Sequence, residues 1–222
     1  MTHPNLASVL PDIPELVKIS KAIAMLDAIL CEEWEYRYYS FNSHWDQDDP
    51  AQMMASMRNG SGNHYFIWFS SVGAAIKGFD HESMISPYSN GNQGRHYPGV
   101  LDHVPVEFAP FLNEPAFVIN ETTFCFWRRL KDSQWHSGKV EFPAHAGEDP
   151  DGAKNLLAIL DGRPSTYVDH ASDCFDIDVD ETAVAHVYSL KPLTSGLLSR
   201  LNSERSLEDL SEDIAEIGYP VE

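Results

Sequence analysis

The fold class of this chain is decided by one stretch of sequence, His64-Tyr65-Phe66-Ile67-Trp68-Phe69-Ser70-Ser71-Val72-Gly73-Ala74-Ala75-Ile76-Lys77-Gly78-Phe79. Residues 64–69 are almost all aromatic or β-branched, which predicts a strand that is buried on both faces. Residues 70–73 are small or turn-forming, so they predict a turn into a second strand over residues 74–79. The stretch therefore predicts a β-hairpin.

A helix and two shorter elements are expected upstream of the hairpin. Apolar residues recur at three- and four-residue steps, which predicts a helix that begins at Asp12 or Pro14 and ends near Glu32. The aromatic residues at 34–41 then predict a strand. Residues 52–57 contain three methionines and precede a Gly-rich cluster, a pattern that predicts a short helix.

Downstream of the hairpin, the sequence predicts a long loop over residues 86–99 and a short helix within residues 104–115. Further strands are expected at residues 116–127 and 135–142, where aromatic and β-branched residues are frequent. Helices are expected in the rest of the chain, at residues 153–160, 165–175, 181–190, 194–201 and 207–217. A strand around residues 184–188 is the alternative to the helix at 181–190.

Together these elements predict an α+β fold: an antiparallel sheet of four to six strands, an N-terminal helix and a mainly helical acidic C-terminal region packed on the sheet. The clearest internal boundary is the turn-rich stretch 145–152, which separates an aromatic-rich α+β core over residues 1–144 from an acidic helical region over residues 145–222. Because about 78 mostly polar residues would give only a thin core of their own, we expect the second region to pack on the first as one domain.

The chain carries a strong negative charge that is concentrated toward its C-terminal end. It has 34 acidic and 15 basic side chains, a net charge of −19, and residues 145–222 alone hold 17 acidic and 5 basic side chains. Phosphate binding needs clustered Lys and Arg, so this charge argues against nucleic acid and against anionic membranes as partners. Two explanations of the charge are left, solubility alone or steering toward a basic protein partner.

The localisation is predicted from the cysteines and from targeting signals. No apolar run reaches the roughly 18 residues that a membrane span needs, and residues 1–10 lack the features of a signal peptide. Three cysteines, Cys31, Cys125 and Cys174, are far apart in the sequence, which is typical of free thiols in a reducing compartment. The sequence therefore predicts a cytoplasmic protein.

The sequence contains no phosphate-binding loop, no paired-histidine zinc helix and no nucleophile-elbow serine. The alternating acids of residues 176–181 resemble the start of a calcium loop, but Glu181 stands where such a loop requires Gly. We therefore predict neither a metal nor a cofactor.

The densest group of reactive side chains is Asp80-His81-Glu82, which directly follows the hairpin. Two carboxylates and an imidazole on a rigid strand end are suited to acid–base catalysis or to binding. The alternative is a strand-end turn in which Asp80 and Ser83 bond to nearby backbone, and this is the arrangement that we expect. Asp80, His81 and Glu82 are kept as candidate binding residues.

Two tryptophans stand out because they lie in polar segments. Trp45 lies within residues 43–50 and Trp135 lies within residues 131–137. An exposed Trp beside charged residues is typical of a protein-interaction hot spot, so we expect Trp45 and Trp135 to be exposed contact residues. The other tryptophans occupy strand positions and are expected in the core.

In composition, the chain resembles small bacterial proteins of unknown function, including the immunity proteins that neutralise polymorphic toxins, which are often acidic, cytoplasmic, α+β and rich in Trp. The resemblance covers no motif and assigns no residue. With the net charge of −19, it favours a non-enzymatic interaction protein, such as an inhibitor of a basic partner. The alternatives are a module that binds a small ligand against the aromatic sheet, or an enzyme of unfamiliar type that uses Asp80, His81 and Glu82.

Overall fold

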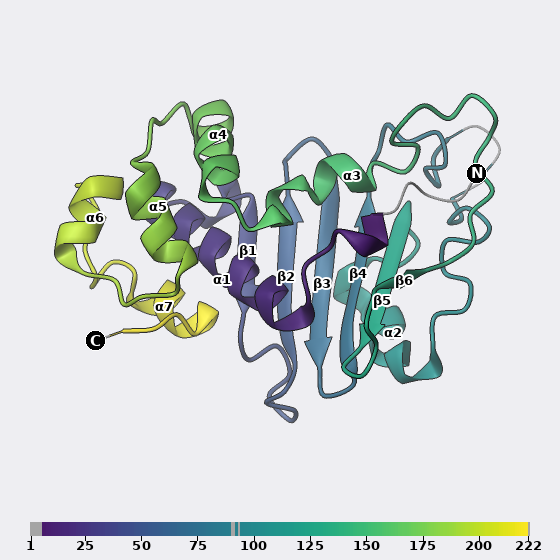
Figure 1. Ribbon diagram of the computed structural model, residues 1–222, viewed down its shortest axis with the longest axis horizontal. Coiled ribbons are helices and arrows are strands. Elements are labelled where there is room, and N and C mark those ends of the chain that lie inside the picture. Colours follow the sequence, from purple (N-terminus) through teal and green to yellow (C-terminus); the bar gives the residue numbers. More distant parts are fainter. Residues whose placement is uncertain (1–5, 90–91, 93, 222) are drawn as a thin grey trace. The chain divides into compact units, whose positions relative to one another are not determined.

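The computed structural model of the chain describes residues 6–89, 92 and 94–221. Six strands form one antiparallel sheet in the order β1-β2-β3-β4-β5-β6, and seven α-helices lie in the described residues (Figure 1). The first helix precedes the sheet in the sequence, one lies between β4 and β5, and the other five follow β6. The predicted α+β class, with an N-terminal helix and several C-terminal helices, is confirmed.

The chain divides into two compact units, each built from two separate stretches of sequence. Unit 1 comprises Met1–Ile13 and Ser56–Ala158, and unit 2 comprises Pro14–Ala55 and Ile159–Glu222. These boundaries differ from the expected one near residue 145, because the first helix clusters with the C-terminal helices. The expectation of a single packed domain stays a prediction.

The hairpin of unit 1 forms as the sequence predicts. Strand β3 (His64–Ser70) pairs antiparallel with β4 (Gly73–Phe79), and their register ends with Ser70 opposite Gly73. Gly73 has φ 151°, and a Cβ at this position would stand 2.1 Å from the Arg128 carbonyl oxygen, so the turn needs glycine. β4 in turn pairs with β5 (Phe124–Arg129), and β5 pairs with the two-residue strand β6 (His136–Ser137).

Both faces of this hairpin are buried, as its aromatic run indicates. Directly paired residues share a face of the sheet, so Phe66 and Lys77 lie on the same side. That side is covered by the aromatic rings of Phe108, Phe111 and Phe117. They come from three short helices in succession, η3 (Val106–Phe108), α2 (Ala109–Asn113) and η4 (Pro115–Phe117); α2 lies behind the strands in Figure 1.

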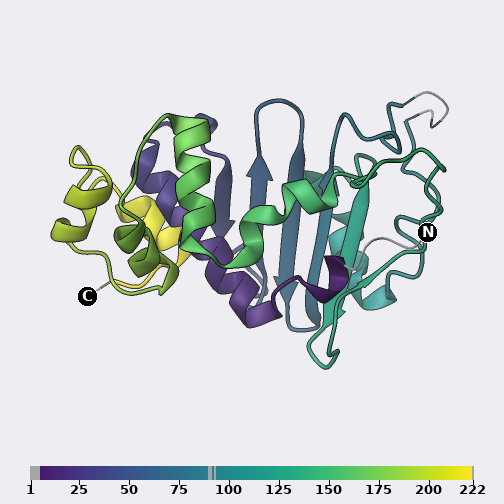
Figure 2. The same ribbon diagram turned by 45° about the horizontal axis from the view of Figure 1, so that its top comes forward.

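Unit 2 is mainly helical but also contains strand β1 (Tyr39–Asn42). Helix α1 (Ile13–Leu30) is followed by the single turn η2 (Trp34–Tyr36) and by strand β1 (Tyr39–Asn42). The later helices α4, α5 and α7 lie around α1 in both views (Figure 1 and Figure 2). The C-terminal helices of this unit are α4 (Pro164–Phe175), α5 (Glu181–Tyr188), α6 (Ser195–Leu201) and α7 (Ser211–Ile217).

Two upstream predictions are wrong. Residues 52–57 do not form a helix, because Met53–Arg58 is strand β2, which lies between β1 and β3 in the sheet. Pairing with neighbouring strands outweighs the helix propensity of methionine. Residues 34–41 are not one strand, since the chain first makes the turn η2 and enters the sheet only at Tyr39.

Three downstream elements are shorter than predicted. Strand β5 begins only at Phe124, because Pro115–Phe117 is helical and Val118 adopts a left-handed conformation with φ 46°. β6 stops at Ser137, and the next residue, Gly138, packs so closely on the Gly99 carbonyl oxygen that a Cβ there would stand only 1.8 Å from it. The helix expected over residues 207–217 begins at Ser211.

The remaining elements are short. Unit 1 also contains η1 (Leu6–Ser8) and α3 (Ala153–Leu156), and the turn η5 (Ala158–Asp161) reaches the boundary between the units. Of the helices in the described part of the chain, none has the length and apolar character that a membrane span requires.

Candidate functional site

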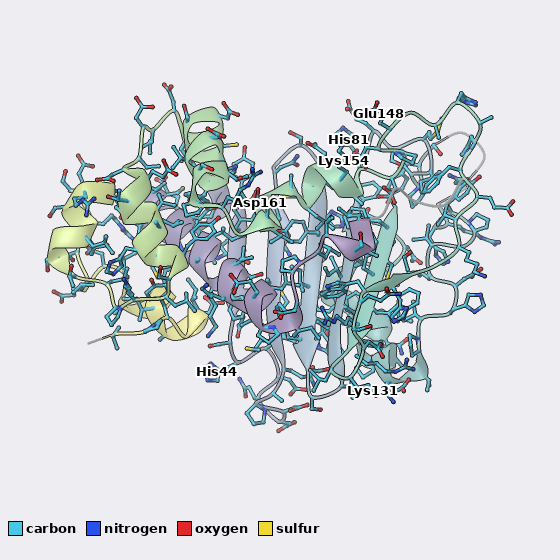
Figure 3. The ribbon with its side chains drawn as sticks, in the orientation of Figure 1. His44, His81, Lys131, Glu148, Lys154 and Asp161 are labelled. Atoms are coloured by element: carbon cyan, nitrogen blue, oxygen red, sulfur yellow. The ribbon has the colours of Figure 1, made fainter. Side chains whose placement is uncertain are left out.

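Asp80, His81 and Glu82 form a strand-end turn at the end of β4. The Asp80 carboxylate accepts a hydrogen bond from the Glu82 amide at 2.9 Å, and it packs against Gly152, where a Cβ would stand 2.2 Å from Oδ2. His81 is held by Asn63, whose Oδ1 accepts from the His81 amide at 2.9 Å. His81 and Glu82 are exposed to solvent, and His81 lies at the opposite end of the strands from Lys131 (Figure 3). Among the three side chains, the structure therefore brings only His81 and Glu82 near each other, with 4.0 Å between His81 Nε2 and a Glu82 carboxylate oxygen, while the Asp80 carboxylate bonds to backbone.

The two tryptophans expected at the surface are not the most exposed ones. Trp135 is only 2% exposed, and its indole N–H donates to the Pro11 carbonyl oxygen at 2.8 Å. Trp45 is partly buried, and its amide donates to the Gln52 carbonyl oxygen. The expectation that Trp135 is an exposed contact residue is wrong, because its polar neighbours in sequence turn outward while its ring turns inward. The exposed tryptophan is Trp34, which is 57% accessible.

Trp34 lies in a short segment that alternates acidic and aromatic side chains, Glu32-Glu33-Trp34-Glu35-Tyr36. We call residues 32–36 the acidic aromatic segment. All five residues are exposed, and Tyr36 reaches 62%. The backbone makes one 3₁₀ turn here, in which the Tyr36 amide donates to the Glu33 carbonyl oxygen at 3.1 Å. A turn this short leaves its side chains without a core to bury them.

Arg37 fixes the acidic aromatic segment to helix α7. Its guanidinium donates to both carboxylate oxygens of Asp213, at 2.5 and 3.2 Å, in the two-pronged geometry that arginine favours. The same side chain donates to the carbonyl oxygens of Cys31 at 2.8 Å and Glu32 at 3.1 Å. Only 8% of the Arg37 side chain is exposed. One cation therefore holds the backbone that precedes the exposed residues.

A second set of contacts joins the same segment to the connection between α6 and α7. Asn202 donates from its amide group to the Ile29 carbonyl oxygen at 2.8 Å, and Arg205 lies 3.8 Å from the Glu32 carboxylate. Residues 202–213 therefore lie beside the end of α1, and they expose four further carboxylates, those of Asp209 and of three glutamates, Glu204, Glu208 and Glu212. We call residues 32–36 and these three glutamates the acidic aromatic surface.

The two units differ strongly in charge. Unit 1 contains 12 acidic and 8 basic residues, a net charge of −4, whereas unit 2 contains 22 acidic and 7 basic residues, a net charge of −15. The acidic aromatic surface therefore belongs to the unit that carries most of the negative charge. Such a field raises the rate at which a positively charged partner arrives.

Unit 1 holds a buried lysine. The Lys77 side chain is 0% exposed, and its ammonium group donates to His64 Nε2 at 3.1 Å and to the carbonyl oxygens of Val118 at 3.2 Å and Glu121 at 2.5 Å. Burial lowers the pKa of Lys77 to about 7. Burial and the neighbouring lysine lower the pKa of His64 to about 4. All three ammonium hydrogens are engaged, so this group holds the 118–121 turn on the sheet and has no donor left for a substrate.

Unit 2 holds a buried aspartate. The Asp27 side chain is 0% exposed and accepts hydrogen bonds from the amides of Tyr38 and Tyr39, at 2.8 and 2.9 Å, and from the Tyr167 hydroxyl at 2.7 Å. Burial raises the pKa of Asp27 to about 7, although these hydrogen bonds oppose the shift. Asp27 thus ties the start of β1 and helix α4 to α1, a structural role.

Across residues 6–89, 92 and 94–221, no three His, Cys, Asp or Glu side chains gather in a way that could hold a metal ion. Comparison with protein-family models, with curated proteins and with solved structures finds no match to this chain.

Sequence reasoning missed Trp34 and the arginine that anchors it. The signal was present in the alternation of residues 32–36, because three glutamates interleaved with aromatic rings cannot all be buried in one strand. The partner of Arg37 could not be found in this way, since Asp213 lies 176 residues further along the chain.

Proposed function

We propose that this chain is a non-enzymatic interaction protein that binds a basic protein partner through the acidic aromatic surface of unit 2. The observation that carries the proposal is the exposure of Trp34 and Tyr36 among three exposed glutamates. Tryptophan and tyrosine supply large contact areas that lose little entropy on binding, and they are enriched among the residues that dominate binding energy.

The anchoring of the surface supports the same function. Arg37 and Asn202 hold the backbone on either side of the segment in place before any partner arrives. A surface that is ordered in the free protein loses less conformational entropy when it binds, which increases affinity. The carboxylates of Glu33 and Glu35 have no cationic partner among the described residues and so are available to Lys and Arg side chains of another protein.

The specific form that we propose is an inhibitor or immunity protein that neutralises a basic toxin or nuclease. The net charge of −15 on unit 2 suits a partner that itself binds anionic substrates, and it disfavours nucleic acid as a direct ligand of this chain. Cys31, Cys125 and Cys174 are free, which is in keeping with the cytoplasm as the compartment in which the protein works.

The test uses two variants that change the charge of unit 2 by the same amount at different places. One replaces Glu32, Glu33 and Glu35 by glutamine, and the matched control replaces the exposed acids Asp173, Asp176 and Asp178 by asparagine. The full chain and both variants are immobilised, and proteins captured from cells that encode the chain are quantified by mass spectrometry. Trp34→Ala is added to separate the aromatic contribution from the charge.

We expect a captured protein that is basic and is released by salt. Its capture should fall about tenfold or more with the Glu32/Glu33/Glu35 variant and with Trp34→Ala, and by less than about twofold with the control. Capture that falls equally with both triple variants would show that only net charge matters. The proposal is contradicted if no captured protein depends on residues 32–36, or if those that do are acidic.

A further inference from the structure

Beside the acidic aromatic surface, unit 2 has an apolar groove between the start of α6 and helix α7. The groove has a volume of about 460 Å³ and is lined by Leu193, Leu207, Ile214, Val221 and three hydroxyl residues, Thr194, Ser195 and Ser211. Leu193 forms a buried floor, whereas Leu207 is 37% exposed and Val221 is 61% exposed at the mouth. This volume can accept two or three aliphatic side chains.

The sequence around the groove is acidic. Glu208 and Asp209 follow Leu207 directly, and Glu212 and Asp213 lie between the lining residues Ser211 and Ile214. The Asp213 carboxylate accepts hydrogen bonds from Arg37, and the Asp209 carboxylate accepts one from Ser206. Glu208 and Glu212 are exposed and have no cationic partner among the residues that the structure describes. The carboxylates of Glu208 and Glu212 are therefore next in sequence to residues that line the groove.

Apolar grooves with charged rims are the usual receptors for amphipathic helices, whose apolar side chains at i, i+3, i+4 and i+7 enter the groove while the charged face meets the rim. Because the exposed Glu208 and Glu212 directly follow the lining residues Leu207 and Ser211, and because the whole unit has a net charge of −15, a cationic helix has the complementary charge.

We infer that the α6–α7 groove of unit 2 binds the apolar face of a basic amphipathic helix of the partner protein, with Leu207 and Ile214 as the apolar contacts and Glu208 and Glu212 as the rim. The inference rests on the proposed function, since it names the kind of element that the basic partner presents. The acidic aromatic surface supplies a contact with the same partner through residues 32–36.

The inference is tested with defined peptides and the full-length chain. The first probe is a fluorescent peptide of about 16 residues that forms a Leu/Lys amphipathic helix, and the second is a scrambled peptide of the same composition and charge without an apolar face. Fluorescence anisotropy measures both at low and at moderate salt. We expect the patterned peptide to bind about tenfold more tightly than the scrambled one.

Two pairs of variants locate the binding. Leu207→Gln removes an apolar contact at the groove, and Leu130→Gln makes the same change at a leucine that is 63% exposed in unit 1. Ser195→Trp fills the groove from its hydroxyl lining and keeps all of its apolar lining residues, and Ser199→Trp places the same ring one turn further along α6. We expect Leu207→Gln and Ser195→Trp to abolish the preference for the patterned peptide, and the two controls to leave it unchanged.

The possible failures are distinguishable. If both peptides bind equally, or if the patterned peptide keeps its advantage in Leu207→Gln and Ser195→Trp, the groove is not the receptor and the inference is overturned, while the proposed function still stands on residues 32–36. If the patterned peptide does not bind even at low salt, the inference is overturned as well. Loss of partner capture in the Glu32/Glu33/Glu35 variant is measured separately and reports on the proposed function alone.

Discussion

Unit 1 and unit 2 differ in the charge of their surfaces, yet they bury an ionisable group in the same way. Unit 1 has a net charge of −4 and encloses a lysine that donates to backbone carbonyl oxygens; unit 2 has a net charge of −15 and encloses an aspartate that accepts from backbone amides. Burial shifts the pKa of Lys77 down and that of Asp27 up, both to about 7.

The comparison separates two uses of charge. Inside each unit, a fully buried ionisable side chain, Lys77 or Asp27, bonds to backbone groups, and either sign of charge can do so. At the surface the sign matters, because it selects what the unit attracts. In the function that we propose, the excess acid of unit 2 serves partner binding, whereas Lys77 and Asp27 hold unit 1 and unit 2, respectively, together from inside.

The largest effect is expected from Lys77→Ala. The change leaves the Glu121 carbonyl oxygen and His64 Nε2 without the lysine donor, removes one of two donors to the Val118 carbonyl oxygen and opens a cavity. The free energy of unfolding should therefore fall by about 3–5 kcal/mol. Urea unfolding followed by tryptophan fluorescence measures this fall. The control is Lys139→Ala, at an exposed lysine of the same unit, and it should change the free energy of unfolding by less than about 0.5 kcal/mol. If Lys77→Ala and Lys139→Ala lowered the free energy of unfolding by similar amounts, Lys77 would not be the residue that holds the 118–121 turn.

A slightly smaller effect is expected from Arg37→Ala. Removing the guanidinium leaves the partly buried Asp213 carboxylate unpaired and frees the acidic aromatic segment, at a cost of about 3 kcal/mol. Hydrogen exchange at the amides of residues 32–36 should accelerate at the same time. Arg163→Ala, at an exposed ion pair in the same unit, is the control and should be nearly neutral. Unchanged exchange in Arg37→Ala would contradict the anchoring role.

The effect of pH on the free energy of unfolding should be smaller than the effects of these two substitutions, and it should have opposite signs in the two units. The folded pKa of Asp27 is raised from 3.8 to about 7, so its contribution to stability is complete below pH 4 and is lost as the pH rises to 7. The folded pKa of Lys77 is lowered from 10.5 to about 7, so its contribution grows as the pH rises from 7 toward 10.5.

Two substitutions isolate these contributions. The difference in unfolding free energy between the wild type and Asp27→Asn should fall between pH 4 and 7, and the difference between the wild type and Lys77→Met should rise above pH 7. Chemical denaturation across this range measures both. Parallel pH profiles for the wild type and either variant would show that the group in question does not titrate as its burial implies.

The smallest effect is expected from the surface charge. Replacing Asp173, Asp176 and Asp178 by asparagine should stabilise the protein by a few tenths of a kcal/mol at low salt, because like charges in unit 2 repel each other. The gain should vanish at about 1 M salt, where screening acts within about 3 Å. A destabilisation would reveal a structural role for one of these acids.

The sequence was informative where a pattern is local. The aromatic run of β3, the turn at Gly73 and the apolar spacing of α1 depend on neighbours a few residues away, and each formed the expected element. Residues 52–57 form a strand because of the strands on either side of them, which composition does not reveal. The burial of Trp135 could not be predicted for the same reason, because the acceptor of its indole hydrogen bond is the Pro11 carbonyl oxygen, far away in the sequence.

The most direct test of the proposed partner site places a photo-crosslinking phenylalanine derivative at Tyr36 of unit 2 or at Tyr88 of unit 1, which are 62% and 66% exposed. The two positions have similar accessibility and carry the same residue in the two units. We predict that a basic partner is crosslinked from position 36 and not from position 88. Crosslinking of that partner from position 88 alone would contradict its assignment to the acidic aromatic surface.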